Sequence, residues 1–408
     1  MPNLSVGFCF VTFRLLTGKG ITILERIKAL LGIYAPDAHA QLERERLTEA
    51  AIKRAEESAV VERANFEAAA DKTLTFLRRV LASEVGPTDR CELAHSLVLQ
   101  RTRLRKLPGN LVIQGDLRLD GCQRFQRFTG DELTVKGDLV IGGPRLNNHW
   151  IGDDQRAKEH GRRVNEFLTQ PAVESQSPFS QWPRKVTVAG DVTLVNCRQL
   201  TALPEEFSFG GDIQIVNCGL ESLPAGMKVH GKLTLDNCPM AQLPRNLVAE
   251  RLELRNLTIR EFADDLMVQT RLAIKCCPAL IAIRMKQVCD WLVVQQCGLK
   301  ELPGEACRAR FIRLRECPIS VLEIPDECHS LNIRNCENLN EIRIAHKEIG
   351  LGYLQIKNCP ELSQLPSGLS LQALQLSNLP ALKRLPKDLT CRTTIELVDT
   401  ELEAVAPG

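Results

Sequence analysis

Cysteine is the residue type in this chain with the most chemical potential, and there are 16 of them. Most recur at one position of a repeating pattern: Cys122, Cys197, Cys218, Cys238, Cys277, Cys297, Cys317, Cys336 and Cys359. Thiolates bind metals or form disulfides, but metal ligands must converge on one point, whereas residues that occur once per repeat lie in a row. We therefore interpret these cysteines as small buried packing residues in a reducing environment, and we expect no metal site.

The sequence carries no recognisable catalytic motif. Its seven histidines are scattered, and it contains no phosphate-binding loop, nucleophile elbow, zinc-protease helix or dinucleotide fingerprint. We therefore expect no catalytic residues, no cofactor and no enzymatic activity. The competing hypothesis is an enzyme or regulator whose activity resides in the N-terminal helical segment, with the repeats as its substrate-recognition module.

The cysteines belong to a repeat of about twenty residues that organises most of the chain. The segment from Gly190 to Cys197 reads GDVTLVNC, and it is followed by GDIQIVNC and GKLTLDNC. From Cys197 onward the last position of this frame recurs every 19 to 23 residues, and earlier frames bring the total to about 14. The consensus is L-x-L-x-x-C-x-x-L-x-x-L-P. A period of this length indicates a solenoid, in which each unit buries its apolar face against its neighbours.

Each repeat predicts a short strand followed by an extended return segment. The two apolar residues at period two point inward from the strand, and the later leucines point inward from the returning chain. Proline removes a backbone donor, so the return segments should contain few helices. Because the leucines form the core, Leu233→Ala or Leu314→Ala should cost ~2–5 kcal/mol, whereas Gln214→Ala on the outer face should be nearly silent.

This repeat resembles that of leucine-rich-repeat proteins, and its length and Leu-Pro step are similar to the short bacterial class found in type III secreted effectors. The resemblance covers Leu97 to the C-terminus apart from one insertion. It implies an α+β solenoid, a leucine-rich-repeat horseshoe with a parallel β-sheet on the concave face and an N-terminal helical cap. It also implies a protein-binding scaffold or adaptor, one form of which is a secreted bacterial effector. The location implied is the cytoplasm, or a host cell reached by a non-classical route.

The sequence outside the repeats predicts three further segments. Residues 1–40 form a leader, either a loosely ordered secretion-type signal or a membrane-touching amphipathic piece. Residues 41–94 form a helical segment whose last part caps the solenoid, because Leu74, Leu77 and Leu81 share a helical stripe. The solenoid occupies residues 95–408, and an insertion at 145–184 should comprise a helical turn followed by disordered chain. No run is long and apolar enough to predict a transmembrane helix.

The strand frame predicts which side chains lie on the outer, concave face of the sheet. The residues before, between and after the two inward positions form a first, a middle and a third row. The first row is acidic in the N-terminal half and becomes basic and aromatic further on. We define the basic stripe as these candidate binding residues: Arg251, Arg255, Arg271, Lys275, Trp291, Phe311, Arg313, Arg315, Arg334, Tyr353 and Lys357.

The basic stripe predicts binding of a protein partner, and its charge favours an acidic one. Stacked strands lie about 4.8 Å apart, so the part from Arg255 to Lys357 should extend over roughly 25 Å. Arginine and exposed aromatic residues dominate interface energetics. Two alternatives stay open, a solvated face without a partner and a binder of single-stranded nucleic acid or phosphoinositide. The net charge of +2 provides no global attraction to nucleic acid.

Overall fold

The computed structural model describes residues 51, 53–54, 75–76, 90–142, 177–262, 265–283, 285–302, 307–344 and 349–403. The chain divides into two compact units, Met1–Ala68 and Ala69–Gly408, and the second unit contains a parallel β-solenoid. The predicted leader and most of the predicted helical segment lie outside the described residues, as does most of the insertion.

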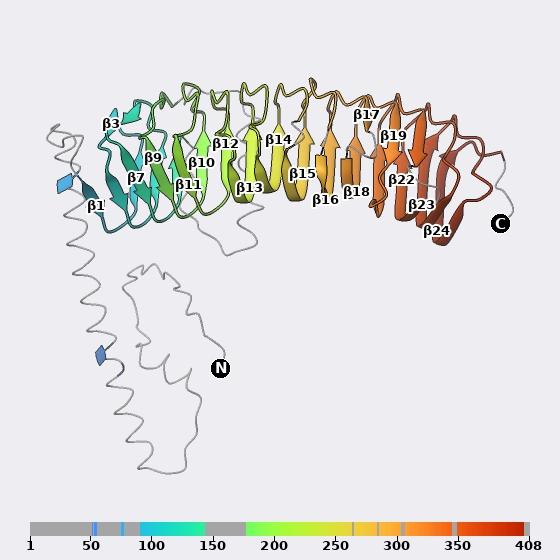
Figure 1. Cartoon of the computed structure of the whole chain (residues 1–408), viewed down its shortest axis with the longest axis horizontal. Coiled ribbons are helices and arrows are strands. Elements are labelled where there is room, and N and C mark those ends of the chain that lie inside the picture. The colour runs from blue at the N-terminus through green and yellow to red at the C-terminus, as the bar shows by residue number, and fades with distance from the viewer. Residues whose placement is uncertain are drawn as a thin grey trace, which may run out of the picture. The chain divides into compact units, whose positions relative to one another are not determined.

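One wall of the solenoid is a sheet of 14 parallel strands, one from each repeat, which stack in chain order (Figure 1). The strands are β2 (Leu97–Gln100), β5 (Leu117–Asp120), β8 (Leu139–Ile141), β10 (Val192–Val195), β12 (Ile213–Val216), β13 (Lys228–Asp236), β14 (Val248–Arg255), β15 (Met267–Lys275), β16 (Met285–Gln295), β18 (Cys307–Arg315), β20 (Ser330–Arg334), β22 (Ile349–Lys357), β23 (Leu369–Leu379) and β24 (Thr390–Thr400). The predicted repeat frame coincides with these strands, so the prediction of a repeating solenoid is confirmed.

A second sheet, which the repeat pattern did not predict, forms another wall. It contains β1 (Cys91–Leu93), β4 (Leu111–Ile113), β7 (Glu132–Val135), β9 (Lys185–Val188) and β11 (Glu206–Phe209). Two small sheets join return segments, one of β3 (Lys106–Leu107) and β6 (Arg127–Phe128), the other of β17 (Glu301–Leu302), β19 (Val321–Ile324) and β21 (Glu341–Ile344). No helix occurs in the described coils. The extended return is thus confirmed, and α+β is too broad a description of these residues, since a coil of about twenty residues leaves little room for helix.

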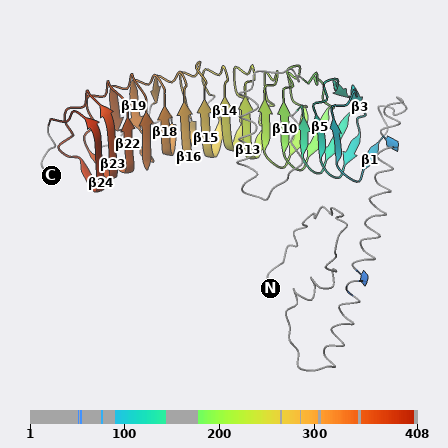
Figure 2. The same ribbon diagram turned by 180° about the vertical axis from the view of Figure 1, so that it is seen from behind.

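The corner between the two walls changes along the solenoid. In the N-terminal coils a Gly-Asp pair separates two short strands, and the aspartate caps the next coil: the backbone N–H of Asp191 donates to Asp138 Oδ1 at 2.9 Å, and that of Asp212 donates to Asp191 Oδ1 at 2.7 Å. Glycine fits this position because a Cβ at Gly211 would lie 2.1 Å from Asp191 Oδ1 and 2.9 Å from the backbone carbonyl carbon of Gly190. From β13 onward most strands instead run through the corner, several with a register shift there. Figure 2 shows the longer strands of this half from behind.

The core consists of inward apolar residues stacked in rows. Leu233 and Leu314 are fully buried, as are Cys197 and Cys359, so the interpretation of the repeated cysteines as packing residues agrees with their positions. The residue before each such cysteine adopts a left-handed backbone, with φ of 60° at Asn196 and 50° at Asn237. Asparagine tolerates this conformation well, and it occupies the position in seven of the 14 coils.

The two ends of the solenoid differ. At the N-terminal end, Leu97 is buried, and Phe76 belongs to the same hydrophobic core; the rest of the predicted cap lies almost entirely outside the described residues. At the other end, β24 leaves Ile395 and Leu397 49% and 36% exposed, although both occupy inward positions of the frame. Among the described residues, no further strand pairs with the outer edge of β24.

The last part of the insertion is packed, so the expectation of disordered chain is wrong for residues 177–183. The backbone N–H of Ser177 donates to the carbonyl of Asn196 at 3.0 Å. Phe179 is fully buried and its ring lies 5.6 Å from that of Phe125 and 4.7 Å from that of Trp182. The Ser- and Pro-rich composition suggested disorder, but two aromatic residues provide enough apolar area to hold this short stretch against the solenoid.

Candidate binding face on the 14-stranded sheet

Strand register brings the residues of the basic stripe together on one face. In the first row, Arg251 pairs with Arg271, which pairs in turn with Trp291, and Trp291 pairs with Phe311. In the third row, Arg315 pairs with Arg334, and Arg334 with Lys357. The remaining members follow the same frame: Arg255, Lys275, Arg313 and Tyr353. The predicted rows are therefore present, and contacts within them decide which members keep an uncompensated charge.

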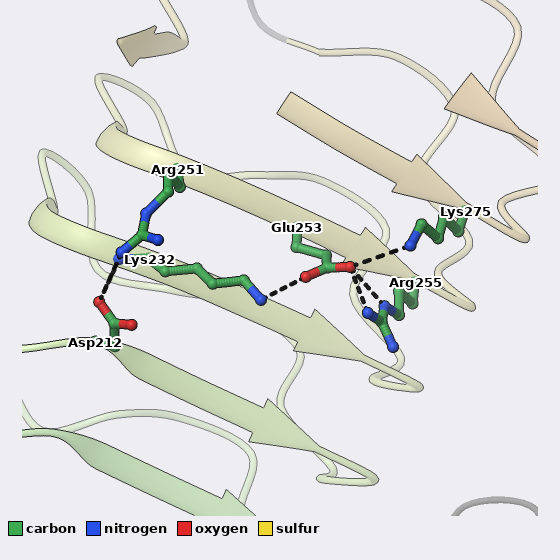
Figure 3. Close-up of polar contacts among 6 residues, drawn as sticks. All are labelled: Asp212, Lys232, Arg251, Glu253, Arg255 and Lys275. Carbon is green, nitrogen blue, oxygen red and sulfur yellow. Dashed lines mark hydrogen bonds and ion pairs between the residues drawn. The ribbon is translucent and has the colours of Figure 1, made fainter. Parts of the chain in front are cut away.

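The N-terminal end of the stripe is largely neutralised from within (Figure 3). Glu253, in the middle row of β14, accepts ion pairs from Lys232 at 2.5 Å, from Lys275 at 3.5 Å and from Arg255. Arg251 forms a further ion pair, in which its Nη2 lies 3.6 Å from Asp212 Oδ1. Arg251, Arg255 and Lys275 are thus engaged with neighbouring carboxylates and are poorly placed to be the main contacts of an acidic partner.

Glu253 is held as a carboxylate. Burial alone would raise its pKa, but the hydrogen bonds and positive charges of Lys232 and Arg255 lower the pKa to about 2. Only 11% of its side chain is exposed, so these charges interact with little screening by water. Glu253 is not among the residues predicted from the sequence, because only cations and aromatic residues defined the stripe. The signal available in the sequence was a lone acid in the middle row between basic neighbours.

Arg315 also has an internal partner. Its Nε donates to Glu316 Oε1 at 2.7 Å, and Gln296 Nε2 donates to Glu316 Oε2 at 2.7 Å. The hydrogen bonds from Gln296 and Arg315 lower the pKa of Glu316. Arg315 is therefore a weaker candidate contact than the sequence alone suggests.

The uncompensated positive charge lies further along the stripe. Arg271, Arg313, Arg334 and Lys357 are exposed, and none of them forms an ion pair within the part of the chain that the structure describes. Arg334 donates from Nη2 to the neutral Gln355 Oε1 at 2.6 Å, which orients the guanidinium without removing its charge. These residues, spread over β15 to β22, are the best placed to attract an anionic group.

Two aromatic side chains lie among these cations. The rings of Trp291 and Phe311 stack across β16 and β18, with centroids 4.4 Å apart and an angle of 18° between their planes. Trp291 is 40% exposed, and the His329 ring lies 6.5 Å from that of Phe311. Because the rings cover each other's faces, the pair offers mainly ring edges and the far face of the indole to a ligand. Tyr353 lies apart from this pair, and its hydroxyl donates to Gln375 Oε1 at 2.8 Å.

The acidic half of the first row has a structural role. Its aspartates accept backbone N–H groups of the next coil, including that of Lys232, which donates to Asp212 Oδ1 at 2.7 Å. From β14 onward the corner no longer depends on an aspartate acceptor, and the first row carries Arg251, Arg271, Trp291, Phe311 and Tyr353. The change of corner thus coincides with the change of surface chemistry.

The described cysteines are all free thiols. Burial raises the pKa of Cys238 and that of Cys336 to about 12, so these thiols stay protonated at neutral pH and are poor nucleophiles and metal ligands. Within the described ranges, no group of three or more His, Cys, Asp or Glu side chains is arranged to hold a metal ion. In the same ranges, no helix is long and apolar enough to cross a membrane.

No protein-family model matches the chain, and no curated protein or solved structure is significantly similar to it.

Proposed function

We propose that this chain is a binding scaffold whose ligand-contacting surface is the outer face of the 14-stranded sheet. The observation that carries the proposal is the juxtaposition of a partly exposed aromatic pair, Trp291 and Phe311, with exposed cations that have no acidic partner among the described residues. Side chains of these types contribute most of the affinity in protein interfaces, since rings bring rigid area and guanidinium groups bring forked donors. A protein partner with acidic groups fits this face best.

We also propose that the solenoid is of the leucine-rich-repeat type, with the 14-stranded sheet on its concave side. The repeat L-x-L-x-x-C with its Leu-Pro step supports this assignment, as do parallel strands at a period of about twenty residues. The similarity of the repeat to that of type III secreted effectors makes a secreted bacterial effector, or a cytoplasmic adaptor, the corresponding biological setting.

The scaffold is proposed to act without catalysis. An enzyme with its active site in residues 1–95 is the competing function, and assays of the full chain beside the isolated fragment 96–408 would detect it. An enzymatic activity that needs residues 1–95 would favour the competing function, whereas partner binding retained by fragment 96–408 would favour the scaffold.

The test of the proposal is a triple variant on the exposed face, Trp291→Ala, Phe311→Ala and Arg313→Ala. Affinity purification from cells with the wild-type chain should identify a partner, and the triple variant should lose it. Binding of that purified partner should then fall at least about tenfold by calorimetry, the scale expected for central interface residues. Arg343→Ala is the matched control, because Arg343 is an exposed arginine on β21, away from the 14-stranded sheet. Equal partner binding by the wild type and the triple variant would overturn the proposal.

The positive charge of the basic stripe would also suit a nucleic-acid or phosphoinositide ligand. Single-stranded nucleic acid usually binds by stacking bases on open aromatic faces. The mutual stacking of Trp291 and Phe311 covers the inner face of each ring, so the pair cannot stack a base between its rings, and this observation favours a protein partner.

A further inference from the structure

We infer that the exposed face binds an extended acidic peptide segment of its partner along a diagonal track, an inference that rests on the proposed function. The track is defined by Arg271, Trp291, Phe311, Arg313, Arg334 and Lys357. The track omits those cations of the basic stripe that pair with Asp212, Glu253 or Glu316. It also omits Tyr353, which lies apart from the ring pair.

Strand register gives the track its direction and length. Arg271 lies in the first row on β15, Arg313 in the middle row on β18, and Arg334 and Lys357 in the third row on β20 and β22. From Arg271 to Lys357 the track crosses four strand spacings of about 4.8 Å and advances four residues of about 3.3 Å along the strands, so it is about 23 Å long. An extended peptide of about seven residues has this length.

Charge selects the chemistry of the segment. The four cations have no acidic partner among the described residues, so a ligand carboxylate would form an ion pair there without displacing an internal one. At the N-terminal end of the stripe, a ligand would compete with Glu253 and Asp212 for the same cations. The distribution of unpaired charge therefore directs an acidic segment to the diagonal and not along the first or third row.

The aromatic pair reinforces this preference near the middle of the track. Aromatic rings carry partial positive charge at their edges and negative charge on their faces. Because Trp291 and Phe311 cover each other's inner faces at 4.4 Å, they present their edges and the far face of the indole to a ligand lying across β16 and β18. Apolar side chains and carboxylates both suit ring edges, whereas successive nucleobases need several open faces. An acidic peptide with aliphatic or threonine side chains between its acids matches this surface.

The inference can be tested with defined probes and the full chain. A fluorescein-labelled decapeptide that alternates Glu and Thr is titrated with the protein and followed by anisotropy, with a Gln and Thr decapeptide as its uncharged control. A ten-nucleotide oligothymidine and phosphatidylcholine vesicles containing phosphatidylserine probe the two other anionic classes. The variants are Trp291→Ala, Arg313→Ala and Arg334→Ala, with Arg343→Ala and Arg251→Ala as controls off the track.

The acidic peptide should bind saturably, and the Gln peptide should bind at least about tenfold more weakly. Trp291→Ala should weaken binding of the acidic peptide about tenfold, and Arg313→Ala and Arg334→Ala each about two- to fivefold. Both control variants should change it less than about twofold, and 0.5 M NaCl should weaken it strongly.

Four results would overturn the inference. The first is equal affinity for the Glu and Gln peptides. The second is a larger loss from Arg251→Ala than from Arg313→Ala, which would place the ligand on the neutralised end of the stripe. The third is binding of the oligonucleotide or the vesicles, but not the peptide, that depends on Trp291 and Arg313. The fourth is the absence of any peptide binding. If the cellular partner then still needs Trp291, Phe311 and Arg313, the peptide inference fails and the proposed function stands. If the peptide does not bind and the cellular partner does not need these residues, both are rejected.

Discussion

Glu253 illustrates how one residue sets both stability and surface charge. Its folded pKa of about 2 lies below the ordinary value of 4.5, so ionisation of Glu253 stabilises the folded state above pH 4.5. That contribution decreases as the pH falls from about 4.5 towards 2, and it amounts to roughly 3 kcal/mol at most. We expect Glu253→Gln to lower the free energy of unfolding at pH 7, with the difference from the wild type narrowing below pH 4. Urea unfolding followed by circular dichroism at several pH values measures this.

Asp191→Asn provides the comparison for this prediction. Asp191 is exposed and its Oδ1 accepts a backbone N–H, which the oxygen of an asparagine can also do. Asp191→Asn should therefore lower the free energy of unfolding less than Glu253→Gln does. A constant difference between Glu253→Gln and the wild type from pH 7 to pH 2 would show that the carboxylate is not held by its cationic neighbours.

Two adjacent residues on β18 separate the core from the binding face. Leu314 is fully buried, so Leu314→Ala should lower the free energy of unfolding by ~2–5 kcal/mol through lost burial and a residual cavity. Arg313 is exposed, and Arg313→Ala should change stability by less than about 0.5 kcal/mol while it weakens binding. Chemical denaturation of both variants measures the two effects. A large loss of stability in Arg313→Ala would undermine its use in the binding tests.

The turn after each strand contains a residue with a left-handed backbone conformation, and Asn237 is one example. Its φ is 50°, and its Nδ2 donates to Asn217 Oδ1 at 2.6 Å. Asn237→Ala should cost ~1–2 kcal/mol, because alanine is strained at this φ and loses the hydrogen bond to the neighbouring coil. Asn237→Gly should recover part of the loss, since glycine adopts this conformation freely. Equal stability of the Ala and Gly variants in urea would contradict the backbone argument.

The strands of the main wall could be predicted from sequence because inward pairs such as Leu292 and Val294 repeat with a fixed period and are fully buried. The second wall was missed, although Val186 and Val188 alternate in the same way before a Gly-Asp pair. For the return segments, the proline pattern predicted only extended chain with few helices, and not strands that pair into a sheet. Which cations are neutralised could not be read from the rows, because the pairing of Glu253 depends on side-chain conformations across β13, β14 and β15.

At the scale of the molecule, the coils should be additive units. Residues 218–237 span one period and are removed between Asn217 and Cys238, so the deletion restores the same Asn-Cys junction. The shortened chain should keep its β-type circular dichroism spectrum and unfold cooperatively with a lower m-value, because each coil contacts mainly its neighbours. Deletion of residues 218–227 shifts the frame by half a period and should abolish folding. Similar stability of the two deletion variants would contradict the additive description.

The outer edge of β24 has a consequence for how such a molecule is made. Its Ile395 and Leu397 lie at inward positions yet are 49% and 36% exposed, and any coil has such an edge until the following coil is in place. Since each strand pairs with the strand of the preceding repeat, a chain emerging from the ribosome can fold one coil at a time against the coil that has already folded. We expect synthesis and folding to advance together from Leu97, with only the newest coil unprotected at any moment.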